Sequence, residues 1–178
     1  GVSSYIDCGN DSIFKLLEFT LSAWIKADSI KICNGPGDCH NFILTYSPNT
    51  WTNTSSPWKL VVAPTSGGNP SNLLTFYMNL YGLENTVTSI RLQSDSNVNV
   101  SDWYHVVGTF DGAIQSLYEN GEFIDSQNAM VNYEEVVKVL IGATKESADG
   151  SLNAFWKNNS DPQWINDAEV LFISDRDG

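Results

Sequence analysis

The segment Phe19–Lys26 reads Phe-Thr-Leu-Ser-Ala-Trp-Ile-Lys, and an apolar residue occupies every second position from Phe19 onward. Successive side chains of a β-strand point to opposite faces of the sheet, so this pattern predicts a strand with one face in a core. The core face is expected to carry Phe19, Leu21, Ala23 and Ile25, and the opposite face Thr20, Ser22 and Lys26. A strand that buries one face needs a second layer of structure to cover it.

Similar patterns recur along the chain between clusters of Gly, Pro, Asn, Asp and Ser, which separate short strands. Further strands are expected at residues 41–46, 58–63, 73–81, 86–92, 103–110, 114–118, 122–126, 136–142 and 169–174. One helical turn is expected at residues 12–17, where it would cover an open end of the fold. About ten strands with almost no helix predict an all-β, two-sheet antiparallel sandwich.

One tight turn can be assigned from its two residues. Asn120 and Gly121 lie between two expected strands, and Asn-Gly supplies the two positive-φ residues of a type I′ hairpin turn. Longer polar stretches at residues 47–57, 64–72 and 145–161 predict surface loops. Binding sites are often placed on such loops, because a rigid sandwich holds them in position.

The composition fits one domain with an acidic surface. Residues 1–178 suit a single core, so one domain is expected. The formal net charge of -12 repels nucleic acid and anionic lipid, and no apolar run is long enough to insert into a membrane. The carboxylates favour a divalent cation such as calcium, although a solvated acidic surface is the simpler explanation.

Three cysteines leave at least one thiol unpaired within the monomer. Cys33 and Cys39 bracket an Asn-Gly-Pro-Gly-Asp stretch that bends easily, so we expect a disulfide between them. Cys8 lies in an early strand and is expected to be a small buried thiol. A zinc site built from Cys33, Cys39 and His40 lacks a second ligand pair at suitable spacing.

Four Asn-x-Ser/Thr sequons are present, and they begin at Asn10, Asn53, Asn99 and Asn158. Chance supplies some of them, because the chain is rich in Asn, Ser and Thr. Together with the expected disulfide, the sequons favour an extracellular or cell-surface location.

Four segments, residues 5–11, 19–26, 103–112 and 117–122, resemble the laminin-G-like jelly-roll domains of the concanavalin A-like lectin/glucanase superfamily. Their order and spacing match the family, and residues 139–142 are similar to the strand that usually follows. The resemblance implies a concanavalin A-like jelly roll that serves as a binding or structural module. Compared with the family, the usual first strand is missing before residues 1–4, where a turn would be ending.

The resemblance also implies a calcium site at the rim of the sandwich. Its expected ligands are Asp7, Asp167 and Glu169, and backbone carbonyls or water would complete a shell of about six to eight oxygens. Ala168 stands where the family usually has an acid, which puts this site in question.

The catalytic motif of the superfamily's glucanases is missing. No Glu-x-Asp-x-Glu signature occurs, and the adjacent Glu134 and Glu135 would point to opposite faces of a strand. His40 and His105 lack a nucleophile motif such as Gly-x-Ser-x-Gly, and His105 is expected to be structural. The chain is therefore expected not to be an enzyme, and a glucanase-type glycoside hydrolase is the least favoured function.

Sugar recognition uses flat aromatic rings together with polar side chains that bind hydroxyl groups. The tryptophans in expected loops or at strand edges, among Asn, Thr, Ser and Asp, are Trp51, Trp156 and Trp164. These three are the candidate sugar platform, although a rim tryptophan can instead cap the core. The tryptophans within expected strands, which we expect to be buried, are Trp24, Trp58 and Trp103.

Two functions remain open at this stage. The first is an extracellular binding or adhesion module that recognises carbohydrate or another surface protein. The second is a structural subunit of an extracellular assembly, in which the missing first strand leaves a sheet edge to be completed by a strand of a neighbouring chain. Gel filtration separates the two, because only the second requires self-assembly.

Overall fold

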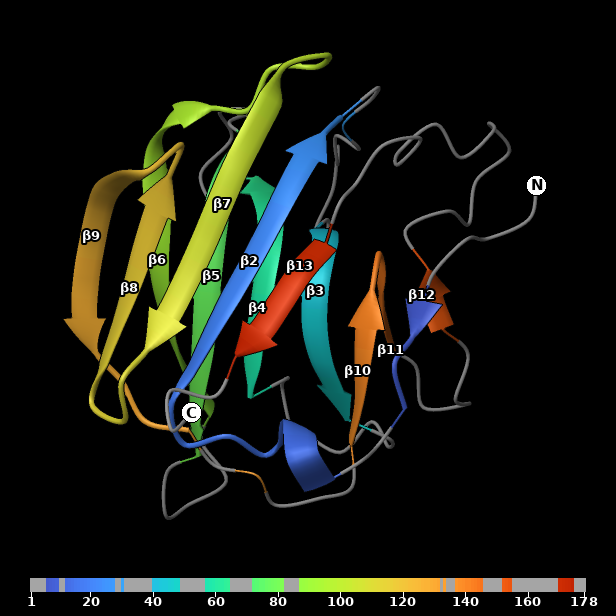
Figure 1. The fold of residues 1–178 in the computed structure, drawn as a ribbon, viewed down its shortest axis with the longest axis vertical. Coiled ribbons are helices and arrows are strands. Elements are labelled where there is room, and N and C mark those ends of the chain that lie inside the picture. The colour runs from blue at the N-terminus through green and yellow to red at the C-terminus, as the bar shows by residue number, and fades with distance from the viewer. Residues whose placement is uncertain are drawn as a thin grey trace.

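The computed structural model describes residues 6–9, 12–27, 30, 40–48, 57–64, 72–81, 87–131, 133, 137–145, 152–154 and 170–174. Within these residues, two antiparallel sheets face each other as the layers of a sandwich (Figure 1). The strand order is β1-β10-β3-β4-β5-β6 in the six-stranded sheet and β13-β2-β7-β8-β9 in the five-stranded sheet. The prediction of an all-β, two-sheet antiparallel sandwich is confirmed.

The strand bounds follow the expected pattern. In the six-stranded sheet they are Ile6–Asp7 (β1), Val137–Ile141 (β10), Asn41–Pro48 (β3), Trp58–Pro64 (β4), Asn72–Tyr81 (β5) and Val87–Asn97 (β6). In the five-stranded sheet they are Val170–Ser174 (β13), Phe19–Lys26 (β2), Trp103–Phe110 (β7), Ile114–Glu119 (β8) and Glu122–Asn128 (β9). A separate antiparallel pair joins Ala143–Lys145 (β11) to Leu152–Ala154 (β12), so part of the stretch expected to be a loop at 145–161 forms a strand.

The expected helical turn is present as a short 3₁₀ helix at Ser12–Phe14 (η1). It lies at the lower end of the sandwich in Figure 1. The Lys15 N–H donates to the Ser12 carbonyl at 2.9 Å, and the Tyr133 hydroxyl donates to the Leu16 carbonyl at 2.7 Å. In the described part of the chain, no helix is long and apolar enough to cross a membrane.

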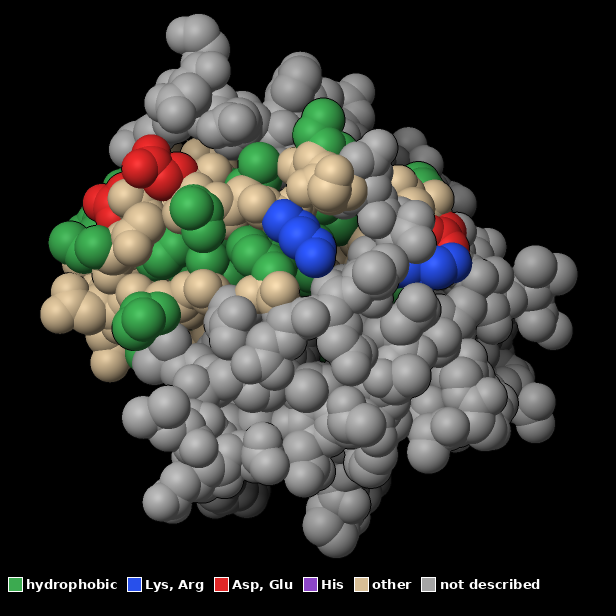
Figure 2. Space-filling view, turned by 90° about the horizontal axis from the view of Figure 1, so that it is seen from below, with side chains coloured by type: hydrophobic (Ala, Val, Ile, Leu, Met, Phe, Trp, Pro, Cys, Tyr) green, Lys and Arg blue, Asp and Glu red, His purple; other side chains and the backbone are tan. Residues whose placement is uncertain are grey.

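Hydrophobic side chains reach the surface at this lower end, which Figure 2 faces. Four exposed hydrophobic residues lie here. Two belong to η1 and the segment after it, one to the start of β8 and one to the chain after β9: Ile13, Leu17, Ile114 and Met130. Their exposed fractions lie between 41% and 70%. None of the four is aromatic, so these side chains offer no flat ring surface.

The core lies between the two sheets. The inward residues of β2, which are 0 to 4% exposed as the alternation predicted, are Phe19, Leu21, Ala23 and Ile25. The ring centroid of Phe19 lies 5.6 Å from that of Trp58 and 6.4 Å from that of Phe76, both in the six-stranded sheet. It lies 5.7 Å from the ring centroid of Phe110 on β7. This aromatic cluster therefore joins the two layers.

The sheets approach each other closely at a position without a side chain. Gly108 lies on β7 opposite Leu21 of β2, and a Cβ atom at Gly108 would lie 3.1 Å from two atoms of the Phe76 ring. Phe76 is completely buried, so the ring has little room to move away. Glycine at this position lets the ring of one sheet lie against the backbone of the other.

The β8–β9 hairpin turns at Asn120 and Gly121, whose φ angles are 52° and 86°. Both are positive, as the type I′ turn requires, so this prediction is confirmed. The turn is also tied to the neighbouring strand. The Asn120 N–H donates to the His105 carbonyl at 2.7 Å, and Asn120 Oδ1 accepts a hydrogen bond from the His105 N–H at 2.9 Å.

The prediction of a buried Cys8 is wrong. Its free thiol is exposed, as are Ile6 and Asp7 before it. The strand β1 has two residues, and among the described strands it lies at the edge of its sheet and pairs with β10. The Cys8 N–H still donates to the Val139 carbonyl at 2.9 Å, so the backbone is paired while the side chain stays uncovered.

One completely buried side chain has no hydrogen-bond partner within the described residues. Gln115 points from β8 into the core, is 0% exposed, and neither its Nε2 nor its Oε1 atom is bonded. Burial of an unsatisfied amide costs about 1–3 kcal/mol in protein mutational data. Gln115 therefore lowers the stability that this core would otherwise reach.

We expect Gln115→Met to raise the free energy of unfolding by about 1–2 kcal/mol, because methionine fills a similar volume without polar atoms. Gln127 is paired with Gln115 across the β8–β9 ladder but is exposed, so Gln127→Met is the matched control, with an expected change within about 0.5 kcal/mol. Urea denaturation measures both values. A loss of stability in Gln115→Met would show that the buried amide has a partner, such as an internal water molecule.

Candidate functional site

Most of the site residues expected from the sequence lie outside the described residues. They are Trp51, Trp156 and Trp164 of the sugar platform, Asp167 and Glu169 of the calcium site, Cys33 and Cys39 of the disulfide, and the sequon residues Asn10, Asn53 and Asn158. Asp7 and Asn99 lie within the described part. The described strands also carry a group of exposed aromatic side chains.

The prediction that Trp24 and Trp103 are buried is wrong. Their exposed fractions are 44% and 43%, whereas Trp58 is 2% exposed and lies in the core as expected. Trp24 stands between two core residues of β2, so the alternation of the strand turns its side chain outward. Trp103 occupies an outward position at the start of β7, paired with Lys26.

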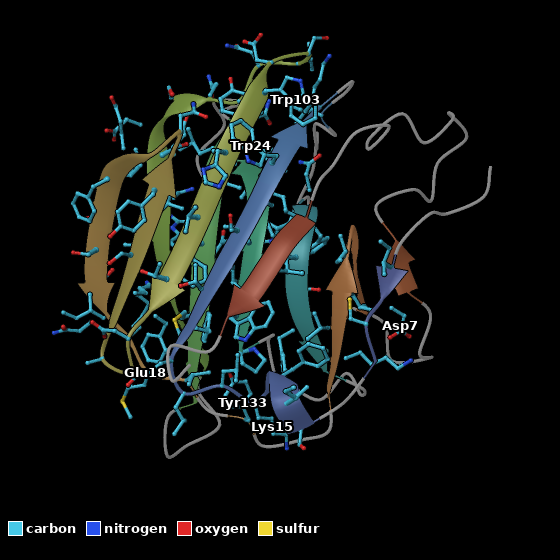
Figure 3. All side chains as sticks on the ribbon, in the orientation of Figure 1. Asp7, Lys15, Glu18, Trp24, Trp103 and Tyr133 are labelled. Atoms are coloured by element: carbon cyan, nitrogen blue, oxygen red, sulfur yellow. The ribbon has the colours of Figure 1, made fainter. Side chains whose placement is uncertain are left out.

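The outward side chains of β2, β7, β8 and β9 form one continuous surface. Its aromatic members, which we call the aromatic face, are Trp24, Trp103, His105, Tyr118 and Phe123. Trp24 is paired with His105 in the β2–β7 ladder, and Tyr118 is paired with Phe123 in the β8–β9 ladder. Figure 3 shows Trp24 and Trp103 near the upper ends of β2 and β7, on the side of the five-stranded sheet away from the six-stranded sheet.

His105 holds Trp24 in place. The two rings are stacked, with centroids 4.8 Å apart and an interplanar angle of 19°. His105 Nε2 is hydrogen-bonded to Ser22 Oγ at 2.9 Å, and the backbone of His105 is bonded to Asn120. The structural role expected for His105 thus takes the form of positioning the Trp24 ring, which stays 44% exposed.

The other members of the face are ordered by similar ring contacts. The Lys26 Nζ atom lies 5.9 Å from the ring centroid of Trp103, within the range of a cation–π interaction. Tyr118 and Phe123 meet edge to face, with centroids 5.7 Å apart and an interplanar angle of 70°. Phe123 remains 57% exposed, so this pair also offers ring surface to solvent.

Below the aromatic face, the same surface continues with hydroxyl side chains. One row of paired residues crosses four strands and consists of Thr20, Thr109, Ser116 and Ser126. We call these four residues the hydroxyl row. The surface therefore has an aromatic half and a hydroxyl half, both carried by the paired strands of one sheet.

The middle of the outer face of the six-stranded sheet is buried, whereas Arg91 on β6 is exposed. A second apolar cluster lies there and consists of Phe42, Val61, Ala63 and Tyr77. Lys59 lies against it at 9% exposure, with Nζ 4.8 Å from the Tyr77 ring centroid and 3.4 Å from His40 Nδ1. Within the described residues, this sheet offers no exposed aromatic surface comparable to Trp24 and Trp103.

Of the expected calcium ligands, Asp7 alone lies within the described residues, and its carboxylate is already paired. Asp7 Oδ2 accepts a hydrogen bond from Lys138 Nζ at 2.6 Å, and Asp7 Oδ1 accepts one from the Gly9 N–H at 2.9 Å. The bonds from Lys138 and Gly9 hold the pKa of Asp7 below its ordinary value. The described part of the chain contains no group of three His, Cys, Asp or Glu side chains placed to hold a metal ion. Calcium at Asp7 would have to displace the Lys138 ammonium group.

Ser22 and His105 are a hydroxyl and an imidazole in hydrogen-bond contact, the pairing of a nucleophile and a base. Acyl transfer needs N–H donors directed at the reacting oxygen. Within the described residues, no N–H donor is seen directed at a site beside Ser22, which is paired with Val107 in the β2–β7 ladder. The contact therefore serves to orient the imidazole ring.

Comparison with known proteins identifies the fold family. A laminin-G family model, described as the concanavalin A-like lectin/glucanases superfamily, matches residues 1–157. No curated protein sequence matches the chain.

Solved structures share the architecture at low sequence identity. The CBM40 of the Ruminococcus gnavus IT-sialidase has a TM-score of 0.58 and 15% identity, covering 85% of this chain and 83% of that one. The same module bound to alpha2,3 sialyllactose has a TM-score of 0.56 and 15% identity, with 85% and 86% covered. A native heptameric SAP-like pentraxin from Limulus polyphemus has a TM-score of 0.52 and 14% identity, covering 79% of this chain, which spans 58% of the pentraxin chain. At these identities the likeness shows the fold alone. The match to the family model covers most of the chain, and the protein therefore belongs to the concanavalin A-like lectin/glucanase superfamily.

Proposed function

We propose that this domain is an extracellular, non-catalytic module that binds carbohydrate through the aromatic face. The observation that carries the proposal is the exposure of Trp24 and Trp103, 44% and 43%, on paired strands beside the hydroxyl row. Exposed apolar surface rimmed by polar residues marks a place that another molecule covers. Tryptophan rings match the C–H faces of sugars, and hydroxyl side chains match their hydroxyl groups.

One of the solved structures supports carbohydrate as the class of ligand. The Ruminococcus gnavus module, whose fold this chain shares, is known in complex with alpha2,3 sialyllactose. A fold hosts many functions, however, so the ligand must be argued from the site. The argument for this chain therefore depends on its aromatic face.

The character of the surface supports a non-catalytic role. Glycoside hydrolysis requires two carboxyl groups on either side of the scissile bond. The outward side chains described on β2, β7 and β8 include no carboxylate. A ligand on these three strands would meet rings, hydroxyl groups, one imidazole and one ammonium group, whereas β9 adds the exposed carboxylates of Glu122 and Asp125.

One of the two edge strands of the five-stranded sheet, β9, carries charges that oppose strand exchange at that edge. Along β9, Asp125 Oδ1 accepts a hydrogen bond from the Ser126 N–H at 2.8 Å, and both Glu122 and Asp125 are exposed. Charged residues on an edge strand oppose the addition of a further strand. Binding of a partner protein by the aromatic face stays the alternative that the following experiment separates.

We expect Trp24→Ala and Trp103→Ala each to weaken polysaccharide binding by at least about tenfold, because each removes one exposed ring from the binding surface. Affinity electrophoresis in gels that contain soluble polysaccharides measures the loss. Met130→Ala, which removes an exposed apolar side chain from the lower end of the sandwich, is the control and should bind like the wild type. Full binding by both tryptophan variants would place the sugar site elsewhere, and a wild type that binds no glycan on an array would refute a carbohydrate ligand.

Calcium binding at Asp7, Asp167 and Glu169 stays a prediction, and Lys138 makes it testable. Since calcium must compete with the Lys138 ammonium for Asp7, Lys138→Gln should increase the rise in Tm on adding millimolar calcium. A ligand at a hundredfold excess over its Kd stabilises the folded state by about 2.7 kcal/mol. Lys15→Gln removes the same charge from an exposed residue and should respond like the wild type. Equal Tm values in calcium and in chelator for all three proteins would rule out the calcium site.

The extracellular location can be tested at Asn99, whose sequon lies in the turn between β6 and β7. Asn99, Val100 and Ser101 are all exposed, so the asparagine side chain is accessible. Secretion from eukaryotic cells should therefore yield a protein with a glycan on Asn99, seen by mass spectrometry and lost in Asn99→Gln. An unmodified Asn99 in the secreted protein would count against this sequon. The disulfide between Cys33 and Cys39 belongs to the same proposal and stays a prediction.

A further inference from the structure

Aromatic side chains occupy four neighbouring strands of the exposed surface. Trp24 is paired with His105 across the β2–β7 ladder. Tyr118 is paired with Val107, which is two residues after His105 on β7, and Phe123 is paired with Tyr118. Phe123 is therefore displaced from Trp24 by three strand spacings across the sheet and by two residues along the strands. With about 4.8 Å between strands and about 6.7 Å per two-residue step, the two positions lie roughly 16 Å apart. A single sugar ring does not reach across this distance.

The aromatic face is open. Trp24, Trp103 and Phe123 are 44%, 43% and 57% exposed, and they stand on strands that are paired with their neighbours. A site for one small ligand usually encloses most of the ligand's surface in a pocket. An open series of rings suits a long ligand instead, because such a ligand gains affinity from several separate contacts.

The β8–β9 end of the face is acidic. Glu122 is exposed, precedes Phe123 and is paired with Glu119 across the hairpin. Burial raises the pKa of Glu119, and the charges of Asp95 and Glu122 raise it further. These acids, together with the formal net charge of -12, repel a carboxylate on a ligand.

One cation stands at the opposite end. Lys26 is the single Lys or Arg of β2, β7, β8 and β9, and its Nζ atom lies 5.9 Å from the Trp103 ring centroid. Asp102, which precedes Trp103, is exposed and offsets this charge. Strong recognition of a carboxylate uses the paired donors of an arginine, and these strands carry none.

We infer that the aromatic face binds an extended, uncharged polysaccharide that runs across β2, β7, β8 and β9. This inference rests on the proposed function and adds the class of ligand. The rings from Trp24 to Phe123 take the C–H faces of successive sugars, and the hydroxyl row lies alongside to bond with sugar hydroxyl groups. A sialylated glycan or a uronate polymer would bring its carboxylates to an acidic surface.

Phe123 distinguishes a long ligand from a short one. We expect Phe123→Ala to weaken the binding of a hexasaccharide from a neutral polysaccharide by about five- to tenfold, and to change the affinity for the corresponding disaccharide by less than about twofold. Trp24→Ala should weaken the binding of both the hexasaccharide and the disaccharide. Ile114→Ala removes an exposed apolar residue from the same sheet beyond the hydroxyl row, and it should affect neither. Isothermal titration calorimetry measures each affinity, and melting curves confirm that each variant is folded.

A comparison of polymers tests the charge of the ligand. We expect the wild type to bind at least one of β-glucan, xylan and mannan at low and at high salt, and to bind alginate and polygalacturonate at least about tenfold more weakly. Stronger binding of the acidic polymers that falls with salt would overturn the inference while leaving carbohydrate binding intact. Equal affinity for disaccharide and hexasaccharide, or an unaltered hexasaccharide affinity in Phe123→Ala, would overturn it as well. If no polymer binds, the proposed function fails and the inference fails with it.

Discussion

The packing of Phe19 between the two sheets is the contact on which the rest of this structure depends. Its ring meets Trp58 and Phe76 of the six-stranded sheet and Phe110 of its own sheet, so it fixes β2 in the core. A slip of one residue would exchange the two faces of the strand, and the buried cluster prevents it. Because Trp24 follows Phe19 by an odd number of positions, the two side chains point to opposite faces, and the constraint that buries the first ring exposes the second.

Strand β7, which is paired with β2, holds the exposed rings in fixed positions. Gly108 lets β7 lie directly against the Phe76 ring, and β7 is paired with β2 along all of its residues. His105 is held by Ser22 through its side chain and by Asn120 through its backbone, and it stacks on Trp24. A ring ordered before the ligand arrives loses little conformational entropy on binding, which favours affinity.

The two outer surfaces of the sandwich differ in what they can do. The outer face of the six-stranded sheet buries Phe42, Tyr77 and the stem of Lys59, so it extends the core. The outer face of the five-stranded sheet leaves its rings in solvent and continues into hydroxyl side chains. A site on paired strands is held more precisely than one on loops, and an acidic surface around it selects against acidic ligands. At the sheet edge, Lys138 supplies Asp7 with the positive charge that a metal ion would otherwise bring.

The sequence by itself determined the all-β class, the core face of β2 and the turn at Asn120 and Gly121. These follow from periods of two residues and from the φ angles a residue can adopt, which are local properties of the chain. It did not reveal the aromatic face, although the alternation in β2 places Trp24 opposite Phe19, because a large apolar ring in a strand is equally typical of a core. A face of a sheet is buried only where a second layer covers it. The six-stranded sheet covers the inner face of the five-stranded sheet, whereas Trp24 and Trp103 on its outer face are exposed to solvent. The tertiary structure also decided that Ser22 meets a histidine 83 residues away, and that the early strand before Cys8 lies at an edge of the described sheet, since strand order is not encoded in local periodicity.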